Sequence, residues 1–292
     1  MTSSDGWQCA GNNTKPPGRG AHNVLWLRTR LPATAVAHPT LYFLIVEQIF
    51  EAYLDGQPLY HFGQLDGTGP DARRFLGNRT HMIPLPGDYG GRLLVLRIHS
   101  ADAILGVSGQ VRLGSTAGVI SAMLHDDVTP YAVGTILCAI GLVAIALFLS
   151  QRTDPSYAHY GGFAFSMGLW LICQTGSRNY LIDAPMAWLT VEIHALYCAV
   201  ACLVRYVHLI FGRGPLGLTR VLADAFLAFV VLSALALAFG WVQLITPLLP
   251  FRILLLIGIV YMLGLMAALS WQGHTEARLF AADDSAYVLE IT

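Results

Sequence analysis

Apolar residues dominate the second half of the chain, in long runs that charged residues rarely interrupt. The run at 131–150, YAVGTILCAIGLVAIALFLS, carries no charge and, at about 1.5 Å per residue, matches a hydrocarbon core of about 30 Å. Backbone polar groups in lipid must be satisfied within their own segment, which favours helices. The pattern therefore predicts a transmembrane helical domain over 131–271. Its five expected helices are 131–150, 156–176, 187–211, 221–241 and 251–271.

The chain follows a period of two from His22 to about Arg112. Short runs rich in β-branched, aromatic or leucine residues alternate there with Gly, Pro, Asp and Asn. The predicted strands are 24–31, 40–46, 49–54, 58–62, 81–85 and 92–98. This rhythm is typical of an antiparallel β-sandwich or jelly roll. Asp55-Gly56 predicts a hairpin, because a type I′ turn needs positive φ at both central residues.

Domain boundaries follow from the change between these two patterns. Residues 1–20 are expected to be a disordered N-terminal segment, and 21–114 an extracellular β-sandwich. The Gly/Ser-containing stretch 115–130 is interpreted as a linker, and 272–292 as a cytoplasmic tail. The chain start lacks the basic and apolar regions of a secretory signal. We therefore expect either that upstream sequence is missing or that the first helix carries the β-domain across the membrane.

Composition narrows the class of protein. Hydrophobic residues make up 55% of the 292 residues and charged residues only 12%, with mean hydropathy +0.56, as in a multi-pass membrane protein. A net charge of −1 argues against nucleic-acid binding, which needs a basic face. The five cysteines contain no C-x-x-C pair, so neither a disulfide framework nor a zinc site is indicated, and no cofactor is predicted.

Arginine positions predict the orientation in the membrane. Of the arginines in or beside the loops that flank the expected helices, four lie after the first, third and fifth helices and two lie on the opposite side. The first group contains Arg152, Arg213, Arg220 and Arg278, and the second contains Arg178 and Arg252. The positive-inside rule then places the β-domain outside the cytoplasm.

Several motifs resemble one family. They are Leu-Trp-Leu-Arg at 25–28, FEAYLDGQ at 50–57, LYHFG at 59–63, HMIPLP at 81–86, the strand at 93–100 and Glu-Ala-Arg-Leu at 276–279. They resemble bacterial seven-transmembrane receptors with diverse intracellular signalling modules, which have an extracellular jelly roll similar to carbohydrate-binding modules. The resemblance implies a sensor whose intact relatives carry a diguanylate cyclase, histidine kinase or phosphatase domain. Helices six and seven and such a module are not found here, so the chain is interpreted as truncated, with 272–292 a remnant of the sixth helix.

The predicted function is therefore the sensory-input part of a membrane receptor that is not itself catalytic. The expected partners are the lipid bilayer and a small-molecule, carbohydrate-like ligand, and a homodimer is left open. A transporter or channel component with an extracytoplasmic β-domain is the alternative, with Pro247 and Pro250 as its only hint. A membrane-bound enzyme is a third reading, but the sequence contains no G-x-S-x-G, H-E-x-x-H or P-loop motif.

Candidate ligand-binding residues are the aromatic and histidine side chains of the predicted strands. An aromatic ring can stack on a sugar, although aromatic residues in strands more often fill the core. The residues selected for ligand contact are Trp26, Tyr53, Tyr60 and His61.

Polar residues within the expected helices form the second group of candidates, because charge in a membrane is costly and tends to have a partner or a role. The group is Glu192, His194, Arg205, Asp224 and Arg252. Glu192 and His194 are two positions apart and so point to different helix faces, which argues against a shared metal site. Arg205 and Asp224 are equally far from the turn at 212–217 and are predicted to pair.

Overall fold

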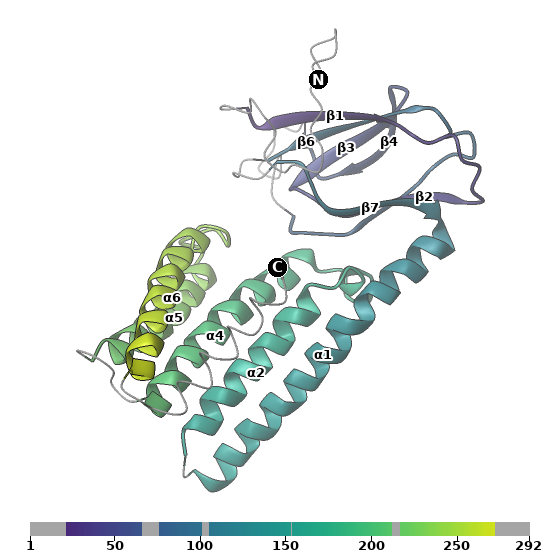
Figure 1. The fold of residues 1–292 in the computed structure, drawn as a ribbon. Coiled ribbons are helices and arrows are strands. Elements are labelled where there is room, and N and C mark those ends of the chain that lie inside the picture. Colours follow the sequence, from purple (N-terminus) through teal and green to yellow (C-terminus); the bar gives the residue numbers. More distant parts are fainter. Residues whose placement is uncertain (1–21, 66–75, 101–104, 153, 212–216, 272–292) are drawn as a thin grey trace. The chain divides into compact units, whose positions relative to one another are not determined.

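The computed structural model describes residues 22–65, 76–100, 105–152, 154–211 and 217–271, and all structural statements concern these residues. The chain divides into two compact units. The first contains the described residues up to Val133 together with Leu171–Val191, and the second contains Gly134–Trp170 and the residues from Glu192 onward. Figure 1 shows strands in the N-terminal part of the chain and helices in the remainder.

Seven antiparallel strands form two sheets in the first unit (Figure 1). The first sheet has the order β1-β6-β3-β4, and the second has the order β5-β2-β7. The strands are β1 (Val24–Arg30), β2 (Pro39–Val46), β3 (Ile49–Leu54), β4 (Gln57–Phe62), β5 (His81–Pro84), β6 (Leu93–His99) and β7 (Val107–Ser115). The predicted antiparallel sandwich is confirmed.

One hydrophobic core lies between the two sheets. Alternate residues of each strand point inward, as the period of two requires. Phe50 of β3 is fully buried and packs edge-on against Phe43 of β2, with ring centroids 6.5 Å apart. The other members of this core include Leu41, Ala52, Leu54, Ile83, Leu94, Leu96 and Ile98.

Strand β7 was not among the predicted strands. Its sequence, VSGQVRLGS, contains two glycines and little continuous apolar character, so it resembles a loop. It becomes a strand because it pairs with β2 over almost the whole length of that strand, with one irregularity between Phe43 and Ile45. Tertiary pairing thus overrides a weak local preference.

The predicted linker 115–130 is helical from its second residue. Helix α1 (Thr116–Gln151) is 36 residues long and includes Pro130. Val119 and Met123 are buried at a spacing of four and pack with Tyr42 of the second sheet. These buried apolar residues on one face therefore stabilise a helix in a stretch whose Gly and Ser residues had suggested a linker.

The described residues contain six helices rather than the five predicted. They are α1, α2 (Ser156–Cys173), α3 (Arg178–Leu181), α4 (Pro185–Phe211), α5 (Leu218–Ala238) and α6 (Leu248–Trp271). The additional one, α3, is a single turn between α2 and α4. Length and composition make α1, α4, α5 and α6 candidate membrane spans. The 18-residue α2, expected as a span over 156–176, is not among these four, because its first turns contain His159 and several other polar residues.

Small and aromatic residues set the packing within the second unit. A Cβ added at Gly141 of α1 would lie 2.5 Å from the Phe165 nitrogen, so α1 and α2 approach through glycine. Tyr197 of α4 is almost fully buried, and its ring packs at a tilt against Phe251 of α6, with ring centroids 4.2 Å apart. Phe251 also packs against Phe229 of α5. Close packing of this kind holds the helices together, because the hydrophobic effect does not favour helix association within lipid.

Candidate functional site

A row of four side chains crosses the first sheet. Trp26 lies opposite Arg97, Arg97 opposite Glu51, and Glu51 opposite His61. Directly opposite residues in a sheet share one face. Their strand neighbours, such as Phe50, lie in the core, so this row is on the outer face of the sandwich.

The row is held together by charge and ring contacts. A guanidinium nitrogen of Arg97 lies 3.4 Å from the Glu51 carboxylate, and its Cζ is 5.6 Å from the centre of the Trp26 ring. The Tyr53 hydroxyl donates a hydrogen bond of 2.6 Å to Glu51, and this bond raises the pKa of Tyr53. Glu51 is thus the shared acceptor of the outer face, while 48% of the Trp26 side chain stays exposed.

A pocket of about 280 Å³ adjoins this row on strands β3 and β4. A register shift between Ala52 and Tyr53 leaves an extra residue on β4 and opens the strand pair. The lining residues are Glu51, Ala52, Tyr53, Pro58, Leu59, Tyr60 and His61. The volume lies at the lower end of the range for ligand sites, so the pocket would admit only a small molecule.

The four selected ligand residues have different surroundings. Tyr53, Tyr60 and His61 line the pocket, whereas Trp26 stands on the same face two strands away. Tyr60 also belongs to the core, because its ring packs on Phe50 and its hydroxyl is 3.1 Å from Nδ1 of His81.

Glu51 and Arg97 were not selected from the sequence. The available signal was a charged residue at an outward position of an otherwise apolar strand. Their mutual pairing depends on a contact between strands 46 residues apart, which the local pattern does not reveal.

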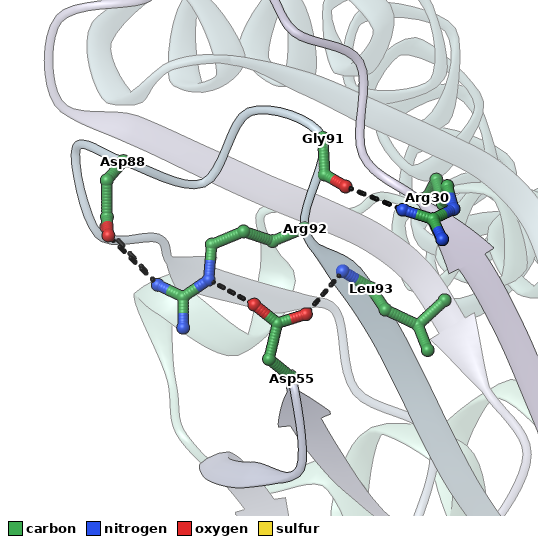
Figure 2. Close-up of polar contacts among 6 residues, drawn as sticks. All are labelled: Arg30, Asp55, Asp88, Gly91, Arg92 and Leu93. Carbon is green, nitrogen blue, oxygen red and sulfur yellow. Dashed lines mark hydrogen bonds and ion pairs between the residues drawn. The ribbon is translucent and has the colours of Figure 1, made fainter.

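The hairpin that carries the pocket is anchored at its turn. Asp55 and Gly56 have φ values of 50° and 81°, as the predicted type I′ turn requires. The Asp55 carboxylate accepts hydrogen bonds from the Leu93 backbone N–H at 2.8 Å and from Arg92 Nε at 2.7 Å (Figure 2). These bonds, the backbone one foremost, lower the pKa of Asp55. Arg92 also contacts Asp88 at 3.3 Å, so three segments meet at this turn.

The second sheet of the same unit is tied to helix ends. Strand β7 ends at Ser115 and α1 begins at Thr116, with no intervening residue. The buried carboxylate of Asp127 accepts hydrogen bonds from the backbone N–H groups of Gly176 and Ser177, at 3.0 and 2.8 Å. Burial, with the nearby Asp127 charge, raises the pKa of Tyr42 to about 12.

The segment preceding β5 makes a second set of ties within this unit. A guanidinium nitrogen of Arg79 lies 3.0 Å from the Asp183 carboxylate, and the amide of Asn179 donates to the Asn78 carbonyl at 3.3 Å. Gly77 has φ of 89°, and a Cβ there would lie 2.7 Å from the carbonyl carbon of Pro185, the first residue of α4. Glycine is required because any side chain would collide with the start of that helix.

Two of the polar residues selected in the second unit form an ion pair, and two others lie beside the aromatic cluster of Tyr197, Phe229 and Phe251. Arg205 and Asp224 form the predicted pair, with a guanidinium nitrogen 2.6 Å from a carboxylate oxygen. His194 packs its ring against Tyr197 at 5.8 Å, and Arg252 follows Phe251 at the start of α6. Glu192 lies in the described part of the chain, where no group of three metal-ligating side chains occurs.

These features define a multi-pass membrane protein with an N-terminal β-sandwich. Residues 131–282, more than half of the chain, match the model of the family described as 7TM diverse intracellular signalling, and the chain belongs to this family. The family is one of membrane receptors with a signalling role. No curated protein and no solved structure matches the chain.

Proposed function

We propose that this chain is the sensory-input part of a bacterial inner-membrane receptor. The sandwich lies outside the cytoplasm and binds a small, polar, carbohydrate-like ligand. The helices relay the bound state to a signalling module on the cytoplasmic side. Family membership favours this function over a transporter or channel component.

The continuity of β7 with α1 is the observation that carries the proposal. A strand that passes into a helix without a linker transmits a displacement of the sheet to the helix axis. Asp127 ties α1 to residues 176 and 177, and Arg79, just before β5, ties the sandwich to Asp183. Ligand in the pocket would act through Tyr60, which both lines the pocket and contacts His81 at the start of β5.

Ligand binding is tested by thermal unfolding of the full-length chain in a neutral detergent against a panel of saccharides and polar metabolites. A ligand at about one hundred times its Kd stabilises the folded state by roughly 2.7 kcal/mol and raises the Tm. Tyr53→Ala, which removes a pocket wall, should abolish the rise. The control Val111→Ala, at an exposed position of the edge strand β7 in the other sheet, should retain it. No rise with any compound would remove the support for a carbohydrate-like ligand.

Orientation is tested by thiol labelling of a Gly87→Cys variant in a Cys9→Ser background. Gly87 is exposed and has open space around its Cα, so a cysteine there is tolerated and reachable. A membrane-impermeant reagent should label it in cells whose outer membrane alone is permeabilised. Labelling only after the inner membrane is lysed would reverse the proposed topology.

A further inference from the structure

Three charged side chains meet at one end of the helices of the second unit. Arg205 of α4 lies 2.6 Å from the Asp224 carboxylate of α5, and Nε of Arg220, one turn earlier on α5, lies 3.7 Å from the same group. Two cations therefore share one anion, and the cluster keeps a net charge of about +1. The Arg220 contact is longer than a hydrogen bond, so Asp224 engages that guanidinium only weakly.

The cluster lies near the ends of two candidate membrane spans, α4 and α5. Arg220 is two residues inside the start of α5, about 3 Å along the axis, and Asp224 is six residues inside, about 9 Å. Arg205 is likewise six residues before the end of α4, about 9 Å. A long arginine side chain can direct its guanidinium back toward the interface, so both cations can reach the level of lipid head groups.

Arg220 and Asp224 lie on an exposed face of α5, which Arg205 reaches from α4. The side chains of Arg220, Asp224 and Arg205 are 61%, 52% and 33% exposed. The opposite face of α5 is buried through Thr219 and Phe226. Charged residues in membrane helices usually face the bundle interior, and a lipid-facing cluster with net charge requires a counter-ion from its surroundings.

Apolar residues continue the same face of α5. Arg220 and Asp224 are followed at helical spacing by Leu227, Val231 and Leu235, all exposed. One stripe thus begins with charge at the interface and continues as hydrocarbon toward the membrane interior. This order matches a phospholipid, whose head group precedes its acyl chain.

We propose that Arg205 and Arg220 bind the phosphate of an anionic phospholipid whose acyl chain lies along Leu227, Val231 and Leu235. A guanidinium presents paired N–H donors that match phosphate oxygens, and Asp224 holds the Arg205 guanidinium on the side of α5 that carries Arg220. The net positive charge favours an anionic over a zwitterionic lipid. This site is independent of ligand binding by the sandwich.

The test is a titration of the full-length chain in neutral detergent with fluorescent phosphatidylglycerol or phosphatidylcholine, followed by anisotropy. The chain should bind phosphatidylglycerol more tightly than phosphatidylcholine. Arg220→Gln should weaken phosphatidylglycerol binding about fivefold, the factor expected for one cation near an anionic surface. Arg252→Gln removes the same side chain at the opposite end of the helices, near the start of α6, and should leave binding unchanged. Equal affinities for both lipids, or equal losses in both variants, would overturn the proposal.

Two further variants separate binding from folding. Arg220→Lys keeps the charge and should retain most of the affinity. Asp224→Asn removes the internal anion and should tighten phosphatidylglycerol binding, whereas a merely structural cluster would bind no better or would lose affinity. Inorganic phosphate at matched ionic strength should not displace the lipid. Displacement by phosphate would assign the cluster to a soluble anion and overturn the lipid proposal.

Discussion

The sandwich and the helical unit place charged residues by opposite rules. On the sandwich, Arg97 and Glu51 pair on an outer face that the period of two directs away from the core. In the helical unit, Arg205 and Asp224 pair inside segments that are apolar over most of their length. Water solvates an unpaired charge on the sandwich, whereas lipid does not. Similar ion pairs therefore have different consequences, and three substitution experiments sharpen this comparison.

The largest expected loss of stability follows from truncating the central phenylalanine of each unit's aromatic cluster, Phe50 in the sandwich and Phe251 in the helical unit. Phe50→Ala in the sandwich should lower the free energy of unfolding by about 3 to 5 kcal/mol, because Phe50 is fully buried among Phe43, Tyr60, Phe62 and His81.

Phe251→Ala is the matched change in the helical unit. Its loss should be smaller, since lipid tails solvate apolar surface and helix association lacks the hydrophobic driving force. Chemical denaturation of both variants in the same detergent measures the two losses. Equal losses would show that the helical unit is stabilised by burial as the sandwich is.

The next effect concerns the ion pairs. Arg205→Leu or Asp224→Leu alone leaves one charge without its partner and should cost on the order of 2 to 3 kcal/mol, more than the double change. The same cycle on Arg97 and Glu51 should give a coupling of about 0 to 1 kcal/mol. Both cycles are measured by unfolding in detergent. Strictly additive losses at Arg205 and Asp224 would show that these two residues do not interact.

The smallest expected change in stability near neutral pH comes from protonation of His81, which is 1% exposed. Burial foremost, and the Arg79 charge, lower the pKa of His81 from 6.5 to about 3. As the pH falls, His81 therefore binds its proton at a higher pH in the unfolded chain than in the folded one. Its titration does not lower the free energy of unfolding above pH 6.5, but lowers it progressively as the pH falls from 6.5 toward 3. The slope is up to about 1.4 kcal/mol per pH unit.

The measurement is the Tm of the sandwich between pH 7.5 and 5. His81→Leu should flatten the profile, while His61→Gln, changed on the outer face, should keep it. A His81→Leu profile as steep as that of the wild type would assign the acid sensitivity to other groups.

The hydrophobic pattern by itself determined which half of the chain forms strands and which forms helices. It placed six of the seven strands nearly to the residue, and Asp55-Gly56 identified the turn, because a period of two and a left-handed turn are local properties. It also predicted the Arg205 and Asp224 pair, since two helices joined by a short loop bring positions equidistant from the turn together.

Only the tertiary structure decided the remaining features, because each depends on contacts between distant segments. Strand β7 exists through its pairing with β2, and the first turns of α1 are stabilised by Val119 and Met123 against Tyr42. The outer row needed four strands in register, and Glu51 contacts Arg97 only because β3 pairs with β6. A local pattern records which way a side chain points, but its partner is set by the fold.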